Sequence, residues 1–286
     1  MKTEGAEGHT QAPVPIISLE ENQAFATVYQ TKAEEFERRA GSASQRLGQV
    51  RVDVARAHRN SITTTDAIQK AYNAEYEGRE PHYAYLSPIL LTEGFTQITG
   101  VNVAEAQKLA VLDVGAGSNE FLRFCKEELQ IPSEQLMGSD ISMASVAIVK
   151  RDGFKGFEGR LETLPIPDQS QDLIYLSYFI DYDTDQQATF DAAVRLAAPK
   201  GKIVLEGWFP VQPFAFLSSD KNTYSFVTKG NSTLEDLNLV KEAFERSGTQ
   251  QGRQITVERF VEGQRYVKSH YGFHKLPSHF IVLSVD

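Results

Sequence analysis

The stretch Val111-Leu112-Asp113-Val114-Gly115-Ala116-Gly117-Ser118-Asn119-Glu120-Phe121 decides the fold of this chain. The mostly apolar residues 109–114 are typical of a short buried strand, and two glycines end it abruptly. From Phe121 onward, apolar residues recur with the spacing of a helix that packs one face. A strand that passes through a glycine turn into a helix opens an open α/β sheet, whose ligands bind at the carboxyl ends of the strands.

The turn itself favours a bound ligand. Gly115 and Gly117 allow a sharp bend and a close approach, because neither carries a side chain. The backbone N–H groups that begin the next helix favour a carboxylate or a phosphate. A dinucleotide fingerprint requires a third glycine where this chain has Glu120, which would lie unfavourably beside a pyrophosphate. The dinucleotide interpretation is therefore disfavoured.

Composition limits the class of protein. The 286 residues suit one large domain, or one domain with a smaller appendage, and 41% hydrophobic residues are enough for a core. A net charge of −9 argues against nucleic acid as the main partner, because that binding uses clustered Lys and Arg. The single cysteine, Cys125, excludes an intrachain disulfide and falls on the apolar side of a helix, where a small core residue is expected.

The sequence gives no sign of export or of a membrane. Its polar N-terminus lacks a signal-peptide pattern, and no run approaches the roughly 20 consecutive apolar residues of a membrane helix. We therefore expect a cytoplasmic protein without membrane contact.

The chain divides into three parts. Residues 1–18 predict a mobile tail, and residues 19–100 predict a helical region outside the sheet, with helices before Gly41, over 42–59 and after Thr65. Residues 101–286 form the expected main domain. Strand patterns there occur at 109–114, 135–140, 172–177, 202–207, 254–261 and 279–285, with helix patterns between most of them. This alternation predicts a mostly parallel sheet with helices on both faces.

The run Asp113-Val114-Gly115-Ala116-Gly117 resembles the first motif of class I S-adenosylmethionine-dependent methyltransferases, in which an acidic residue precedes a G-x-G turn. Asn119 stands where that family often has a further glycine. Other stretches match in the expected order: Asp140, residues 159–172, the end of the strand at 172–177, and residues 196–205. The resemblance implies a Rossmann-like, mostly parallel seven-stranded sheet beside the N-terminal helical region.

The resemblance also implies a cofactor, S-adenosylmethionine, with S-adenosylhomocysteine as its product. Its amino-acid end would lie at Asp113, Gly115, Ala116 and Gly117. Asp140, with Ile141 beside it, would accept hydrogen bonds from the ribose hydroxyls, which suits an acceptor-only carboxylate. Capping of the following helix is the alternative role of Asp140.

On the adenine side, the resemblance points to Arg160 and Leu161. Arg160 stands where many relatives carry an acid, so it would stack on the base, or the contact would come from the Leu161 backbone alone. Ser177 and Tyr178, at the end of the fourth strand, complete the implied cofactor contacts.

Because a sulfonium already activates the methyl group, the protein must align the acceptor and exclude water. A hydroxyl or ammonium acceptor must also lose a proton, and the candidate bases are Asp181, Asp183, Tyr182, His270 and His274. The aspartates are alternatively helix caps, and the histidines alternatively part of a surface hairpin. No carboxylate cluster accompanies the histidines, so no metal is expected.

Aromatic residues mark the expected substrate side: Tyr83, Tyr85, Tyr182, Trp208 and Phe209. Tyr83, Tyr85, Trp208 and Phe209 are alternatively packing residues. We expect methyl transfer to a hydroxyl or amine of a small organic molecule. Protein methylation and a non-catalytic, cofactor-binding scaffold are the alternatives, and a homodimer is left open. The sequence after the fourth strand lacks an Asn/Asp-Pro-Pro-aromatic motif, which disfavours methylation of nucleic-acid amino groups.

Overall fold

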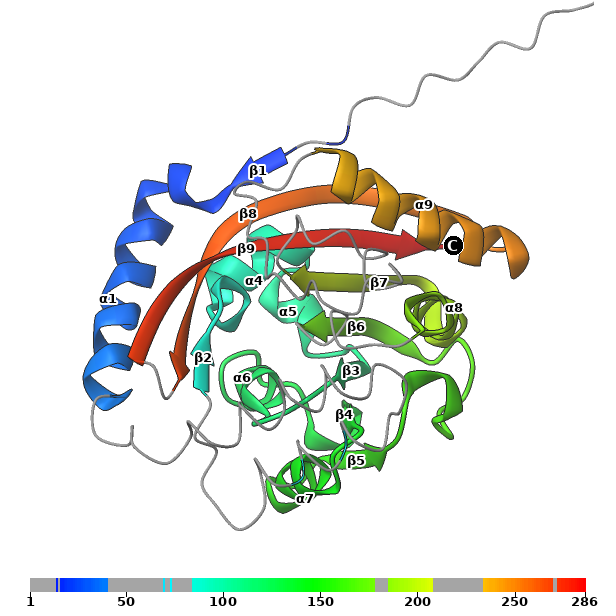
Figure 1. Ribbon diagram of the computed structural model, residues 1–286, viewed down its shortest axis with the longest axis horizontal. Coiled ribbons are helices and arrows are strands. Elements are labelled where there is room, and N and C mark those ends of the chain that lie inside the picture. Colours follow the sequence, from blue (N-terminus) through cyan, green and yellow to red (C-terminus); the bar gives the residue numbers. More distant parts are fainter. Residues whose placement is uncertain are drawn as a thin grey trace, which may run out of the picture.

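The computed structural model describes residues 14, 16–40, 69, 73, 84–177, 185–207, 234–269 and 272–286. Within these residues, one nine-stranded sheet has the order β1-β8-β9-β7-β6-β3-β4-β5, and β2 pairs with β8 (Figure 1). The predicted α/β fold with a mostly parallel sheet is confirmed. Seven of the nine strands lie in residues 101–286, and the N-terminal residues add β1 and β2.

The parallel part of the sheet positions the site. Its strands are β3 (Val111–Val114), β4 (Leu136–Asp140), β5 (Lys155–Glu158), β6 (Gln171–Ser177) and β7 (Ala197–Gly207). Each is parallel to its neighbour. Because they run in the same direction, their carboxyl ends meet at one edge of the sheet, where such folds bind ligands.

The other end of the sheet is a long antiparallel hairpin. β8 (Ile255–Ser269) and β9 (Gly272–Val285) pair along their whole length, and β9 is also antiparallel to β7. Both strands are longer than the runs 254–261 and 279–285 that the sequence indicated. Polar residues dominate the extended halves, so hydropathy alone does not mark them as strands.

Helices cover both faces and enclose two apolar clusters. One face carries α1 (Gln23–Ala40), α4 (Thr92–Thr99), α6 (Glu120–Glu127) and α7 (Met143–Arg151), with short α5 (Val103–Ala106) nearby. The other carries α8 (Gln186–Leu196) and α9 (Leu234–Gln250). Cys125 is buried on α6, as expected of a small core residue.

Two N-terminal segments join the sheet, contrary to the expectation that this region lies outside it. β1 (Ile16–Ser18) is parallel to β8, and β2 (Ala84–Leu86) is antiparallel to it. Residues 16–18 were expected in a mobile tail. Strands of three residues are too short to show a period of two, and they form only because β8 presents a long edge.

Short 3-10 turns link the longer elements: η1 (Leu19–Glu21), η2 (Pro88–Leu90), η3 (Ser133–Gln135) and η4 (Leu161–Thr163). The expected helix over 42–59 lies outside the described residues. Of the expected helix after Thr65, Gln69 and Asn73 are described, and both are helical.

Gly138 lets two helices approach β4 closely. A Cβ atom at this position would lie 3.0 Å from Val149 Cγ2 on α7 and 3.1 Å from Leu122 Cδ1 on α6. The two helices hold β4, and with it the strand end that carries Asp140, against the core.

We therefore predict that Gly138→Val lowers the free energy of unfolding by about 1–3 kcal/mol, because a branched side chain overpacks this contact. Urea denaturation measures the change. Lys155→Val, on the exposed side of the neighbouring strand β5, is the control and should change the free energy by less than about 0.5 kcal/mol. Equal effects of the two substitutions would contradict the prediction.

Candidate functional site

The glycine loop joins the end of β3 to α6 and is bound to β4. Gly115 and Gly117 have φ angles of 73° and 53°, in the left-handed region that favours glycine. The Ser139 carbonyl accepts hydrogen bonds from Gly115 N (2.8 Å) and Ala116 N (3.0 Å). Asn119 also has a left-handed φ, 70°, which asparagine tolerates better than most residues. This explains why asparagine can replace a further glycine there.

Asp140 ends β4 with its carboxylate turned toward the glycine loop. Oδ2 accepts hydrogen bonds from Gly117 N (3.0 Å) and Ser145 Oγ (3.0 Å), and Oδ1 accepts one from Ser142 N (2.8 Å). The N-cap of α7 is Ser142, whose hydroxyl accepts from Ser145 N. The capping alternative for Asp140 is therefore incorrect, and its carboxylate links two strand ends.

Two more carboxylates lie at this edge. Asp113, on β3, is 2% exposed, and burial together with the carboxylates of Glu120 and Asp140 raises its pKa well above its usual value. Burial also raises the pKa of Glu120 and, more than its hydrogen bonds lower it, the pKa of Asp140. Ionised carboxylates so placed favour a positively charged ligand.

Glu120 also changes what the start of α6 can bind. Its carboxylate accepts hydrogen bonds from the Ser118 hydroxyl and from its own backbone N–H. The sequence suggested that this helix start would favour an external carboxylate or phosphate. The protein places its own anion there, which disfavours a second one.

On the expected adenine side, Arg160 forms an ion pair with Glu162. Leu161 is 3% exposed and packs with Leu164 and Ile166 in the core. The Gly159 N–H donates to the Asp140 carbonyl (3.0 Å), which attaches this loop to the end of β4. Gln69 and Asn73 reach the same region: Gln69 Nε2 donates to Glu158 Oε1 (2.9 Å), and Asn73 Oδ1 accepts from Ser142 Oγ (2.8 Å).

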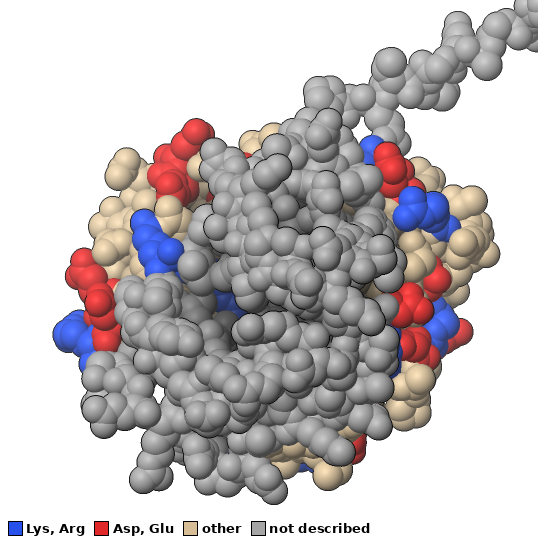
Figure 2. Space-filling view, viewed as in Figure 1, with Lys and Arg blue, Asp and Glu red and all other residues tan. Residues whose placement is uncertain are grey.

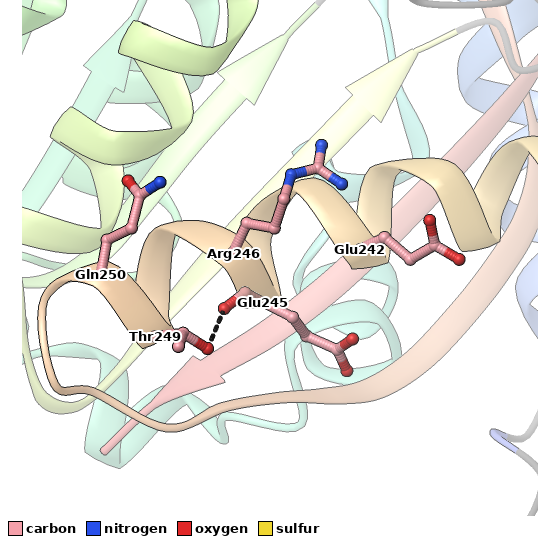
Figure 3. Close-up of a pocket in the computed structure, with 5 residues that line it drawn as sticks. All are labelled: Glu242, Glu245, Arg246, Thr249 and Gln250. Carbon is pink, nitrogen blue, oxygen red and sulfur yellow. Dashed lines mark hydrogen bonds between the residues drawn. The ribbon is translucent and has the colours of Figure 1, made fainter.

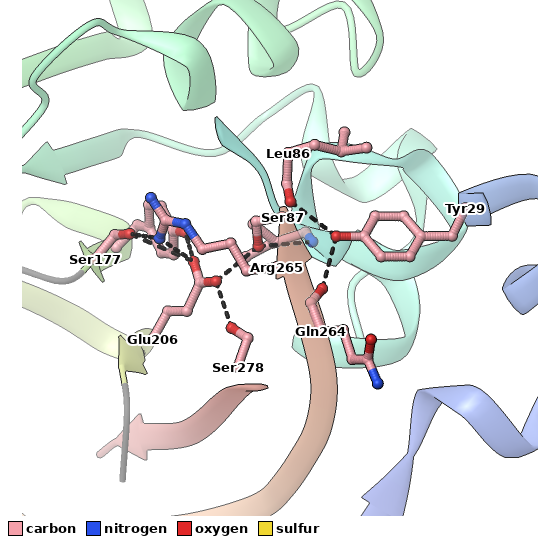
Figure 4. Close-up of polar contacts among 10 residues, drawn as sticks. Tyr29, Leu86, Ser87, Ser177, Glu206, Gln264, Arg265 and Ser278 are labelled. Carbon is pink, nitrogen blue, oxygen red and sulfur yellow. Dashed lines mark hydrogen bonds and ion pairs between the residues drawn. The ribbon is translucent and has the colours of Figure 1, made fainter. Parts of the chain in front are cut away.

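A buried polar group, here called the Glu206 cluster, lies at the carboxyl end of β7 (Figure 4). Glu206 is 0% exposed, and Arg265 on β8 is 2% exposed, with 3.6 Å between Arg265 Nη1 and Glu206 Oε2. The remaining members donate hydroxyl hydrogen bonds to Glu206: Ser87, Tyr175, Ser177 and Ser278. The sequence analysis missed Glu206 and Arg265, because each sits in a strand pattern whose partners are distant in sequence.

The structure places two of the predicted residues at this cluster. The Tyr85 ring lies under the guanidinium of Arg265, 3.8 Å from Arg265 Cζ to the ring centroid. Ser177 accepts a hydrogen bond from Arg265 Nη1 (3.1 Å). Burial and the carboxylates of Asp113 and Glu120 raise the pKa of Tyr85 well above its usual value.

Several predicted residues cannot be placed. Those outside the described residues are Tyr83, Tyr178, Asp181, Tyr182, Asp183, Trp208, Phe209 and His270. The His274 backbone lies in β9 opposite Val267. Ile141 follows Asp140, and its backbone N–H bonds the Asp140 carboxylate.

Other surface features do not resemble a reaction site. A shallow groove on α9 is lined by polar residues, shown in Figure 3: Glu242, Glu245, Arg246, Thr249 and Gln250. β8 begins at Ile255, just after α9. Ile255 pairs with Val285, and Val285 also pairs with Gly201, far from the carboxyl end of β7. This groove therefore lies away from the carboxyl edge of the parallel strands. In Figure 2, acidic and basic side chains alternate along the rim of the described surface.

The described residues contain neither a metal-binding cluster nor a membrane-spanning helix. No group of three or more His, Cys, Asp and Glu in this part of the chain could hold a metal ion. Within the same residues, no helix is both long and apolar enough to cross a membrane.

His279 is a third residue, after Glu206 and Arg265, that was not predicted from the sequence. It lies in β9 opposite Gly207 and Glu262, beside the end of β7. Burial lowers the pKa of His279 from 6.5 to about 4. The folded protein thus holds this imidazole neutral.

This shift predicts a pH dependence of stability. Unfolding restores the ordinary pKa, so the contribution of neutral His279 is complete above pH 6.5 and is lost as the pH falls toward 4. His279→Gln should flatten the fall of the free energy of unfolding across that range, as measured by urea denaturation at several pH values. An unchanged slope would show that other groups cause the dependence.

Comparisons with known proteins agree with this geometry. Residues 112–205 match the family model described as "Methyltransferase domain". The matched segment begins in β3 and ends in β7, so it includes the glycine loop and Asp140. Residues 112–205 are therefore similar to a methyltransferase domain, the kind of protein that the first motif resembles.

Solved structures of similar fold include two such proteins. One is a SAM-dependent methyltransferase from Aquifex aeolicus, with 18% identity, a TM-score of 0.40, and coverage of 62% of this chain and 81% of that one. Another is an S-adenosylmethionine-dependent methyltransferase from Mesorhizobium loti, with 18% identity, a TM-score of 0.43, and coverage of 64% and 93%. No curated protein sequence matches the chain.

Proposed function

We propose that this protein is an active methyltransferase that transfers a methyl group from S-adenosylmethionine to a hydroxyl or amine of a small organic molecule. The hydrogen bond between Gly117 N and the Asp140 carboxylate carries the proposal. It brings the glycine loop and the acidic strand end together, and these are the two parts that would hold the two ends of an adenosyl amino acid.

The charge of the site fits this cofactor. Asp113, Glu120 and Asp140 lie beside the loop, and once ionised they complement the sulfonium and ammonium groups of S-adenosylmethionine. When bound, the cofactor supplies an electrophilic methyl group. The amino-acid end would be held by Asp113, Gly115, Ala116 and Gly117. Residues for the nucleoside end would be Asp140, Ile141, Arg160, Leu161 and Ser177, with Tyr178 beyond them.

Ser145 makes the Asp140 carboxylate adaptable. Its hydroxyl is within hydrogen-bond distance of two acceptors, Asp140 Oδ2 (3.0 Å) and the Gly117 carbonyl (2.8 Å). A hydroxyl has one proton to donate, so it satisfies one acceptor at a time. If a ribose hydroxyl donates to the Asp140 carboxylate, the Ser145 hydroxyl can donate to the Gly117 carbonyl instead. The site therefore accepts the ligand without leaving a buried donor unsatisfied.

The acceptor side combines residues from distant segments. We propose that Tyr83, Tyr85, Tyr182, Trp208 and Phe209 surround the acceptor. One of Asp181, His270 and His274 would remove its proton. Binding of the cofactor without turnover of any hydroxyl, amine or protein acceptor would favour the scaffold alternative.

The proposal predicts that Asp140→Ala weakens binding of S-adenosylhomocysteine about 10- to 100-fold, the loss expected for hydrogen bonds to a charged group. Isothermal titration calorimetry measures the dissociation constant without an acceptor. Asp172→Ala is the matched control. Its carboxylate also accepts a backbone N–H (Ala110, 2.8 Å), but at the opposite ends of the strands, so binding should be unchanged. If the wild-type protein does not bind, the proposal fails.

The raised pKa of Asp113 predicts that the affinity for S-adenosylmethionine depends on pH. A cationic ligand favours ionised Asp113, whose pKa is raised in the free protein, so binding releases protons and affinity for S-adenosylmethionine rises with pH. Binding of S-adenosylhomocysteine, whose sulfur is uncharged, should release fewer protons. Calorimetry in two buffers of different ionisation enthalpy counts the protons, and Asp113→Asn should remove the difference between the ligands. Equal proton release by both ligands would contradict this prediction.

A further inference from the structure

We propose that Glu206 is a positioning residue, which fixes residues 84–88 so that Tyr85 forms a rigid side of the methyl-donor site. This inference rests on the proposed function. Glu206 does not need to touch the cofactor or the acceptor. It acts through Ser87, on the same segment as Tyr85, and through Arg265, which covers the Tyr85 ring.

The first link runs from Glu206 to Ser87. Ser87 Oγ donates to Glu206 Oε1 (2.9 Å), and both residues are 0% exposed. Ser87 lies two residues after Tyr85, and side chains two apart on an extended segment point the same way. A fixed Ser87 therefore restrains the direction of Tyr85.

The second link runs through Arg265. Its Nη1 lies 3.6 Å from Glu206 Oε2, and its Cζ lies 3.8 Å from the centroid of the Tyr85 ring. A planar guanidinium stacks on an aromatic face in a defined orientation, unlike an ammonium. Glu206 thus holds Arg265, and Arg265 holds the ring of Tyr85.

Tyr85 in turn faces the predicted cofactor residues. The sheet register places Asp113 opposite Tyr175, whose hydroxyl donates to Glu206, so the cluster and the end of β3 lie on one face. The carboxylates of Asp113 and Glu120 are close enough to raise the pKa of the Tyr85 phenol. The ring is therefore held between the Glu206 cluster and the acidic end of β3.

The unfavourable desolvation of the buried Glu206–Arg265 ion pair supports a role for the cluster beyond stability. A buried ion pair contributes little net stability, because removing both charges from water is unfavourable. The five polar side chains around the Glu206 carboxylate instead hold it in a single defined geometry. The cluster lies at the carboxyl edge of the sheet, where geometry determines ligand binding.

The test is a double-mutant cycle on the full-length chain, with S-adenosylhomocysteine as the ligand and calorimetry as the readout. Ser87→Ala and Tyr85→Leu should each weaken binding about fivefold or more, and the double variant should bind no more weakly than Tyr85→Leu alone, because coupled residues are not additive. Losses that multiply, or a Tyr85→Leu variant with wild-type affinity, would overturn the inference.

Two controls separate positioning from stability. Ser278→Ala removes another buried donor to the same oxygen (2.6 Å), but from β9, so it should lower stability as Ser87→Ala does and change the dissociation constant less. Glu258→Gln breaks the ion pair with Lys202, which joins the same strands β7 and β8, and should leave binding unchanged. A Ser278→Ala loss as large as that of Ser87→Ala would overturn the inference.

A second variant and a ligand-free readout keep the test decisive. If Ser87→Ala does not fold, Arg265→Lys replaces it in the cycle, because lysine keeps the charge and loses the planar stacking. Hydrogen exchange of amides 84–87 should accelerate in Ser87→Ala and not in Ser278→Ala. Failure of the wild type to bind overturns the proposed function, whereas unchanged exchange overturns the role of Glu206 by itself.

Discussion

The hydrogen bond from Gly117 N to Asp140 is the constraint on which the rest of the site depends. It crosses from the loop after β3 to the end of β4, so the two strand ends cannot move independently. The Ser139 carbonyl adds two further bonds to the same loop. A glycine-rich loop is flexible by composition, and here the neighbouring strand supplies the rigidity that its own residues lack.

A second constraint acts from the opposite side of the site. The Glu206 cluster joins β6, β7, β8, β9 and the residue after β2, which come from four separate regions of the sequence. Tyr29 adds α1, because its hydroxyl lies within hydrogen-bond distance of the carbonyls of Leu86 (2.8 Å) and Gln264 (2.6 Å) and can donate to either. The N-terminal segments are thus part of the sheet's carboxyl edge rather than an appendage beside it.

The sequence predicts the parallel half of the fold well, because its signals are local. The apolar strand, the glycine turn and the helix at 111–121 are contiguous, and Asp140 follows another apolar run. Glu206, Arg265 and Tyr85 could not be grouped from the sequence, since their contacts depend on strand order and register. The strands at 16–18 and 84–86 could not be predicted for the same reason, because they form by pairing with the edge of β8 and not through their own composition.

The pairing of β1 and β2 with β8 also orders events during synthesis. Ile16 pairs with Phe260 and Tyr85 with Val267, so both N-terminal segments leave the ribosome long before their partner exists. Loop closure over such a separation is slow and waits for the distant residues. Tyr85 can therefore take its place only after the C-terminal hairpin has been made. A nascent chain that stops short of β8 would contain the glycine loop and Asp140 but not the finished site.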